Sequence, residues 1–213
     1  MDIKKINNIS SGVFERAEGS DKWYWCSDFT GDLYEAEEIA NQGKDFEGTD
    51  MSIIRYPDGK VFKPFEKKKN IYINSPVADG EALAFLAADF NMGYINIYRY
   101  FPERDFTETA AAMPIKSLRN CYNLRLVTSP LTLCGGDCYD GKIEIVWPEK
   151  AVFDVSEKEI LICRDNDIFY FNEWFEDPEY REEISVRDIK NGKVIKKYNG
   201  SMYGMPDGSW WII

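Results

Sequence analysis

The sequence predicts an all-β protein, dominated by strands with short helical turns, that forms a single β-rich domain over residues 1–213. Aromatic residues are abundant, with 13 Tyr, 13 Phe and 6 Trp, and such side chains pack well on a pleated, half-buried surface. Short apolar runs alternate with period two, and glycine-containing turn motifs separate them, which is typical of antiparallel hairpins. Apolar residues make up 44% of the chain, enough for a folded core.

The first predicted hairpin joins residues 53–56 to residues 60–63 through Pro57-Asp58-Gly59. Proline presets φ for a turn and glycine accepts a positive φ, so this tripeptide favours a reversal of the chain. Residues 71–73 and 82–87 are the next predicted strands, with a turn at Ala78-Asp79-Gly80 between them.

Residues 94–101 give the clearest strand signal. Ile95 and Ile97 share one face, while tyrosines and Asn96 occupy the other, as expected of a half-buried strand. Residues 142–147 alternate in the same way.

The last predicted hairpin pairs residues 184–187 with residues 194–197 around Asn191-Gly192. Asn-Gly favours a type I′ turn, in which both central residues have a positive φ.

Three short helical segments are expected. Asp32 with Glu35 resembles a capping box, and Gly43 is a plausible stop, so residues 33–42 form a predicted helix. A strand that begins near Gly31 is the alternative.

The second helical segment is residues 107–113, which are rich in alanine and end before Pro114. The third is a single turn that starts at Asp177 before Pro178, because proline suits the first helical position.

One turn pattern recurs along the chain. It consists of Asp or Asn, then Gly, Lys and a β-branched residue, and it occurs at residues 58–61, 140–143 and 191–194, with a looser copy at 92–95. A longer match also exists, because residues 70–103 and 123–149 share an ordered series of strand, Ser-Pro, glycine turn, strand and Pro-Glu. This order indicates a repeat of roughly 50 residues.

Repeats of this length with several strands each resemble the blades of a small β-propeller. The resemblance covers most of residues 22–213, and the segment 206–213 resembles an inner strand that closes a ring. It implies four or five irregular blades. The chain lacks a Trp-Asp signature and its spacings are uneven, so a curled antiparallel sheet and a β-sandwich remain alternatives.

The formal net charge is −11. A negative field repels phosphate groups, so neither nucleic acid nor a membrane surface is expected as a partner. A basic protein is attracted by this charge, and a carbohydrate is the other candidate partner. The beginning of the chain shows no secretory signal, and no apolar run is long enough to span a bilayer. A cytoplasmic location is therefore expected.

The chain contains no histidine, which excludes Ser–His and Cys–His nucleophile pairs. An enzyme is therefore not favoured, no catalytic residue is nominated, and no cofactor is expected. The five cysteines are expected to be reduced thiols. Cys134 and Cys138 have the spacing of half a zinc site, but no second pair accompanies them, so no metal ligand is assigned.

The leading hypothesis is a non-catalytic interaction module with an acidic, aromatic-containing surface. The alternative is a carbohydrate-active enzyme or sugar-binding protein that uses carboxylates at a propeller mouth, since carboxylate pairs cleave glycosides. The candidate binding residues are aromatic side chains and turn carboxylates, namely Trp23, Trp25, Tyr98, Asp89, Asp137, Asp140, Glu144, Asp165, Asp167 and Trp210.

Overall fold

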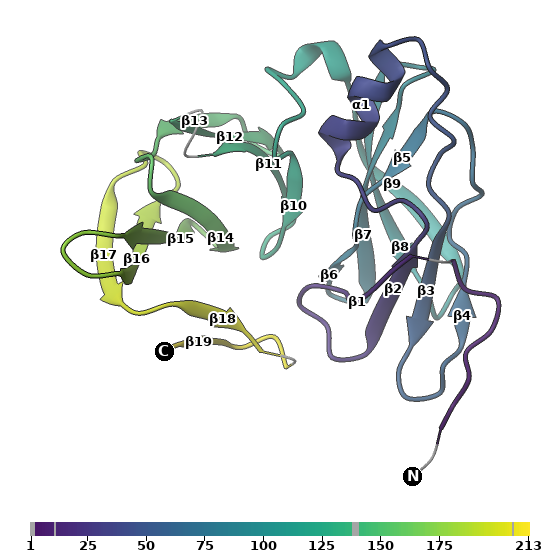
Figure 1. Ribbon diagram of the computed structural model, residues 1–213, viewed down its shortest axis with the longest axis horizontal. Helices are drawn as coiled ribbons and strands as arrows, with labels where there is room; N and C mark the ends of the chain where they lie inside the picture. The colour runs from purple at the N-terminus through teal and green to yellow at the C-terminus, as the bar shows by residue number, and fades with distance from the viewer. Residues whose placement is uncertain (1–2, 11, 138–140, 206) are drawn as a thin grey trace. The chain divides into compact units, whose positions relative to one another are not determined.

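The computed structural model describes residues 3–10, 12–137, 141–205 and 207–213. These residues form two compact units, Met1–Cys121 and Tyr122–Ile213. Strands dominate both units, and one α-helix occurs among the residues described (Figure 1).

The first unit begins with a four-stranded antiparallel sheet in the order β1-β2-β3-β4. Helix α1 lies in the connection between β2 and β3 (Figure 1). The bounds are β1 (Val13–Arg16), β2 (Trp23–Ser27), α1 (Leu33–Asn41), β3 (Met51–Arg55) and β4 (Val61–Phe62).

The second sheet of this unit has five strands in the order β5-β7-β8-β9, with β6 paired to β7. A 3-10 turn, η1 (Ile115–Ser117), follows it. The bounds are β5 (Ile71–Ile73), β6 (Val77–Asp79), β7 (Ala82–Asp89), β8 (Tyr94–Phe101) and β9 (Phe106–Pro114).

The second unit contains two further four-stranded antiparallel sheets and a terminal hairpin. The third sheet is built from β10 (Arg125–Val127), β11 (Thr132–Asp137), β12 (Lys142–Trp147) and β13 (Ala151–Asp154). The fourth is built from β14 (Glu159–Asp165), β15 (Ile168–Phe175), β16 (Arg181–Asp188) and β17 (Val194–Asn199). The hairpin is β18 (Met202–Gly204) with β19 (Trp210–Ile212).

Each of the four larger sheets is an antiparallel meander in which neighbouring strands follow one another along the chain, apart from β6 at the edge of the second. This is the construction of a propeller blade. The predicted all-β class and the resemblance to a small propeller with four blades are therefore confirmed. The expectation of a single domain stays a prediction, since each unit is described by itself.

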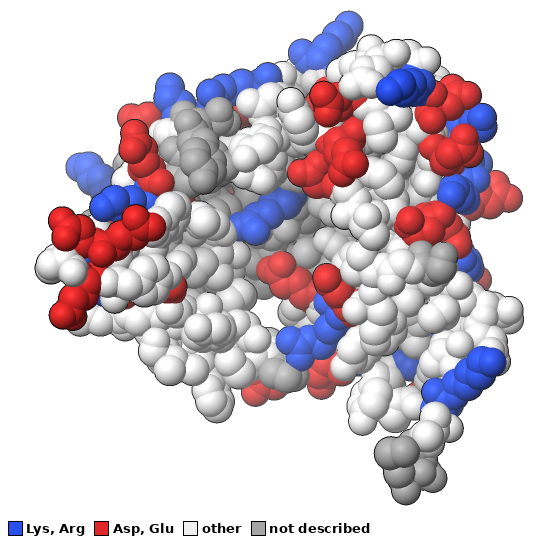
Figure 2. Space-filling view, viewed as in Figure 1, with Lys and Arg blue, Asp and Glu red and all other residues white. Residues whose placement is uncertain are grey.

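The surface of both units carries acidic and basic side chains side by side. Figure 2 shows several separate acidic clusters on the face in view, with lysines and arginines among them. Fifteen ion pairs join described residues. The negative net charge is thus dispersed on this face rather than gathered in one patch.

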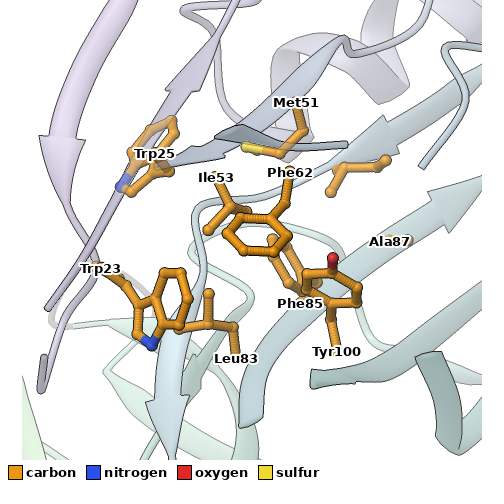
Figure 3. Close-up of a cluster of buried hydrophobic side chains, with 11 residues drawn as sticks. Trp23, Trp25, Met51, Ile53, Phe62, Leu83, Phe85, Ala87 and Tyr100 are labelled. Atoms are coloured by element: carbon orange, nitrogen blue, oxygen red, sulfur yellow. The ribbon is translucent and has the colours of Figure 1, made fainter. Parts of the chain in front are cut away.

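The core of the first unit lies between its two sheets. Trp23 and Trp25 of β2 lie on the same face of the first sheet as Met51 and Ile53 of β3, and β7 and β8 supply the other side of the core (Figure 3). Leu83, Phe85, Ala87 and Tyr100 are the contributors from that second sheet. Burial of these apolar side chains provides the main stabilisation of the unit.

A separate aromatic core stabilises the second unit. Phe153, Phe169 and Phe171 form a triangle of rings with centroids 5.9 to 6.3 Å apart. Two of the three pairs are edge-to-face, the geometry that aromatic quadrupoles favour. The third and fourth sheets therefore pack through phenylalanines.

The helix predicted at residues 33–42 is confirmed as α1 (Leu33–Asn41). The Asp32 carboxylate accepts a hydrogen bond from the Glu35 N–H at 2.8 Å, which satisfies one of the free donors at the helix start. Gly43 follows the helix with φ +69°, the conformation expected of a glycine stop. Leu33 and Ala36 bury the inner face.

The other two helical predictions are wrong. Residues 107–113 belong to strand β9, where eight cross-strand partners on β8 outweigh the helix preference of the alanines. Asp177 and Pro178 lie in a bend between β15 and β16 without a helical turn.

The recurring glycine turns fall at hairpins, but at two different positions in the blades. Gly93 joins β7 to β8 and Gly141 joins β11 to β12, which are equivalent turns in the second and third sheets. Gly59 and Gly192 each precede the last strand of a sheet. All four have φ between +65° and +71°, which explains the shared glycine.

The longer sequence match, between residues 70–103 and 123–149, aligns the second sheet with the third and is confirmed element by element. Its first residues, Asn70 and Asn123, both have a positive φ, at +63° and +50°. The expected type I′ turn at Asn191-Gly192 is wrong, because Gly192 has φ +67° whereas Asn191 is not among the described residues with a positive φ. The connection there is longer than two residues, since β16 ends at Asp188 and β17 begins at Val194.

Candidate functional site

A groove of about 420 Å³ opens on the second sheet of the first unit. We call it the Tyr98 groove, and its walls are the loop Pro64–Lys68, strands β5, β7 and β8, and Thr107 of β9. A volume of this size is within the range of ligand sites in proteins. Two of the sequence-predicted residues, Asp89 and Tyr98, line it together.

Sheet register explains why these side chains share one face of the sheet, with Asp89 opposite Tyr94 and Tyr98 opposite Phe85. Residues directly opposite each other in an antiparallel pair point to the same face, and Ala87 lies opposite both Ile73 and Asn96. Asp89 and Tyr98 are two residues away from Ala87 and Asn96 along their strands, so the period of two puts them on that same face. The groove floor is therefore a sheet surface with a fixed geometry.

The aromatic part of the groove continues the core of the unit. The Phe65 ring lies 5.1 Å from the Phe85 ring in an edge-to-face contact and 5.5 Å from the Tyr98 ring. Phe85 is fully buried, whereas Phe65 and Tyr98 are half-buried. Two aromatic side chains thus reach from the core into the groove.

The loop that carries Phe65 is anchored to the β7–β8 turn. The Asn70 amide donates to the Asn91 side chain at 3.0 Å, and Asn91 donates to the Lys69 carbonyl at 3.0 Å. The Phe90 N–H also bonds to the Asn70 carbonyl at 2.9 Å. These contacts hold the wall in place before a ligand arrives, which lowers the entropy cost of binding.

Asp89 brings negative charge to the end of the groove. Its Oδ1 accepts a hydrogen bond from the Met92 N–H at 2.9 Å, so the carboxylate is held by the turn. Glu66 and Lys68 also line the groove, and their charged groups lie 3.6 Å apart. The three groups together carry one net negative charge.

Burial raises the pKa of the Tyr98 phenol, and the negative charge of Asp89 raises it further. The phenol therefore remains protonated at neutral pH and can donate or accept a hydrogen bond. A groove that is lined by two aromatic rings and has a carboxylate at its end suits a positively charged segment, through cation–π attraction and a charge-assisted hydrogen bond.

The tryptophans proposed as binding residues lie elsewhere. Trp23 and Trp25 are each 8% exposed and belong to the core of the first unit. Tyr24, on the opposite face of β2, stacks on Phe14 with centroids 5.4 Å apart. Trp210 is 38% exposed on the β18–β19 hairpin. None of these three tryptophans lines the Tyr98 groove.

The remaining candidate residues belong to the second unit and do not join the groove. Glu144 lies on β12, and Asp165 and Asp167 flank the β14–β15 turn. A hydrogen bond from Lys190, 2.9 Å away, lowers the pKa of Asp167. Asp137 ends β11, and its side chain and all of Asp140 lie outside the described residues.

Burial favours the neutral thiol form of Cys26 and Cys121. Cys26, Cys121, Cys134 and Cys163 are buried. Burial raises the pKa of Cys26 and raises that of Cys121 to about 12, which makes both poor nucleophiles and poor metal ligands. Cys138 lies outside the described residues. Among the residues that the structure describes, no group of three or more Cys, Asp or Glu could hold a metal ion.

Sequence reasoning missed Phe65, because it lies in a loop where no periodicity marks a buried face. The feature that could have pointed to Phe65 is its aromatic ring inside the charged segment 63–69. Thr107 was also missed, because the segment that contains it was expected to be helical.

Comparison with known proteins identifies no family: no family model and no curated protein matches this chain. Among solved structures, it is similar to the crystal structure of Porphyromonas gingivalis dipeptidyl peptidase 4, with 12% sequence identity and a TM-score of 0.36. The match covers 71% of this chain and 23% of that one, so this chain spans less than a quarter of the length of its structural neighbour.

None of the helices described is long and apolar enough to cross a membrane.

Proposed function

We propose that this protein is a non-catalytic interaction module that binds a positively charged segment of another protein. The observation that carries the proposal is the Tyr98 groove, where the rings of Phe65 and Tyr98 lie on the same sheet face as the Asp89 carboxylate. A Lys or Arg side chain with apolar neighbours complements such a surface, because its stem packs on the rings while its charge faces the carboxylate.

The net charge of −11 supports the same partner. A negative protein attracts basic segments at long range and accelerates their association. The sequence-based expectation of reduced cysteines and the absence of a secretory signal at the start of the given sequence favour a cytoplasmic location for this interaction, because reduced thiols persist in that compartment.

The test uses two fluorescent peptides of equal length. One alternates arginine with apolar residues, and the other carries glutamate in place of every arginine. Fluorescence polarisation should show binding of the arginine peptide alone, with weaker binding at high salt because screening reduces the attraction. Asp89→Asn should weaken binding about tenfold or more, since it removes a charge-assisted hydrogen bond.

A matched control is Glu157→Gln, which removes an exposed carboxylate in the second unit and should leave binding unchanged. The proposal fails when Asp89→Asn binds the arginine peptide as tightly as the wild type. It also fails when a glycan array returns a ligand whose binding depends on Asp89, because that result supports the carbohydrate alternative instead.

A further inference from the structure

A second cavity, of about 500 Å³, lies on the first unit among three chain turns. We call it the turn pocket. Its walls are the β1–β2 loop with Asp21 and Lys22, the β6–β7 turn with Glu81, and the β8–β9 turn with Arg104. None of its lining residues also lines the Tyr98 groove.

The β1–β2 wall is fixed by local hydrogen bonds. Ser20 Oγ accepts from the N–H groups of Lys22 and Trp23 at 3.1 and 3.0 Å. The Ala78 N–H donates to the Glu18 carbonyl at 2.8 Å, which joins this loop to β6. The pocket is therefore built from braced turns, as a pre-formed site requires.

The aromatic rings of the pocket are already covered. The Arg104 guanidinium lies 4.2 Å from the Phe101 ring centroid, and Phe106 stacks beside the same ring at 6.2 Å. The Lys22 ammonium lies 4.9 Å from the Trp23 centroid. Since each ring carries a cation, stacking of a sugar on these rings is not favoured, and the ligand must be recognised by charge.

The carboxylate of Glu103 is already paired with two cations of the protein, so it is not counted among the groups that bind a ligand. One carboxylate oxygen lies 2.6 Å from Lys22 Nζ and the other 2.8 Å from Arg55 Nη1. Arg55 in turn pairs with Asp58 at 2.6 Å. This chain of ion pairs neutralises Glu103 and holds Lys22 at the rim.

Three charged side chains of the pocket have no such partner. No ion pair joins Arg104, Asp21 or Glu81 to another residue within the described ranges. Arg104 is oriented by its contact with Phe101 and keeps its guanidinium donors for a ligand. The pocket thus presents one exposed cation and two exposed anions to the same open cavity.

We infer that the turn pocket binds a small zwitterion of the α-amino-acid type, with its carboxylate on Arg104 and its ammonium on Asp21 and Glu81. A simple anion is repelled by the two carboxylates, and a simple cation is repelled by Arg104. A ligand that carries both charges satisfies all three groups, and a free amino acid fits the available volume.

Isothermal titration calorimetry tests this inference on the full chain, with each common L-amino acid as a separate probe. At least one should bind. Two analogues of that amino acid serve as probes, one without the carboxylate and one without the ammonium group. Each should bind at least tenfold more weakly than the amino acid itself. Arg104→Gln and Glu81→Gln should each weaken binding about tenfold or more, because each removes a charge-assisted contact.

The matched controls are Lys150→Gln and Glu157→Gln, which remove exposed charges of the second unit and should leave binding unchanged. The inference is overturned when no amino acid binds, or when Arg104→Gln binds the best amino acid as tightly as the wild type. Asp89→Asn should retain amino-acid binding and Arg104→Gln should retain arginine-peptide binding, so failure at one site is distinguishable from failure at the other.

Discussion

Arg187 and Glu159 form a two-point ion pair inside the second unit, with Nε–Oε1 at 2.8 Å and Nη2–Oε2 at 2.6 Å. Glu159 is only 1% exposed. It also accepts the Ser156 N–H at 2.8 Å, while Arg187 donates to the Gly192 carbonyl at 2.6 Å. The pair therefore joins the start of β14 to β16 and to the turn that follows it.

Replacement of Glu159 by glutamine should destabilise the second unit by about 3 kcal/mol, because it leaves the partly buried Arg187 charge without its partner. Urea denaturation followed by tryptophan fluorescence measures the change. Glu157→Gln is the control, since Glu157 is exposed, and it should change stability by less than about 0.5 kcal/mol. Equal stability of the two variants would contradict this role of the pair.

The same ion pair makes the stability of the folded protein depend on pH. Burial alone would raise the pKa of Glu159, but hydrogen bonds from Arg187 and the Ser156 N–H together with the Arg187 charge lower it overall. Because folding lowers the pKa of Glu159, the ionised carboxylate stabilises the folded protein at pH values above its pKa in the unfolded chain, which is about 4.3. That contribution is lost as the pH falls through the folded pKa.

Stability measured from neutral pH downward should therefore decrease below about pH 4.3, and the decrease should be smaller in Glu159→Gln. The difference in stability between wild type and variant must narrow as the pH falls. A constant difference across this range would show that the carboxylate does not titrate with folding.

Gly192 requires glycine for two reasons. Its φ is +67°, and a Cβ there would lie 2.6 Å from the Phe153 Cβ. Gly141 is a matched position, because its φ is +65° and no described atom lies within 4 Å of its Cβ position.

We expect Gly141→Ala to cost about 1 kcal/mol from backbone strain. Gly192→Ala should cost at least about 1 kcal/mol more, because the methyl group must displace Phe153 in a packed core. Denaturation midpoints of the two variants provide the comparison. Equal midpoints would mean that the core adapts to the additional carbon.

Asp89 stabilises the β7–β8 turn through a hydrogen bond, and this contribution can be separated from that of its charge. Asp89→Asn retains an oxygen that can accept from the Met92 N–H, so stability should change by less than about 0.5 kcal/mol. Asp89→Ala removes that acceptor and should cost about 1 kcal/mol. Thermal denaturation of both variants distinguishes the two roles, and a large loss of stability in Asp89→Asn would contradict this separation.

The hairpins were predictable because their turns depend on local chemistry. Gly59, Gly93 and Gly141 all adopt the positive φ that their sequence motif requires, and no distant contact is needed to set it. Residues 107–113 were mispredicted because the alanines favour a helix locally, whereas pairing with β8 decides their conformation.

The site was only partly predictable for the same physical reason. Tyr98 lies on the alternating strand 94–101 and Asp89 was expected in a turn, so local sequence was enough to nominate both residues. Phe65 reaches the groove through a loop whose path depends on long-range contacts such as those of Asn70 and Asn91. Trp23 and Trp25 are core residues, because aromatic composition does not distinguish a core from a binding surface.

The electrostatic link between Asp89 and Tyr98 can be measured directly. Burial and then the Asp89 charge raise the pKa of Tyr98. Asp89→Asn removes only the second cause, so the pKa of Tyr98 should fall toward the ordinary tyrosine value of about 10 but remain above it. Nuclear magnetic resonance of ¹³Cζ-labelled tyrosine follows each phenol through an alkaline titration, and Tyr98→Phe assigns the signal. The buried Tyr100, which bonds to Asp105 rather than to Asp89, serves as the internal control and should titrate unchanged in Asp89→Asn. If the Tyr98 titration is the same in both proteins, the carboxylate does not face the phenol, and the groove lacks the charge that the binding of a basic segment needs.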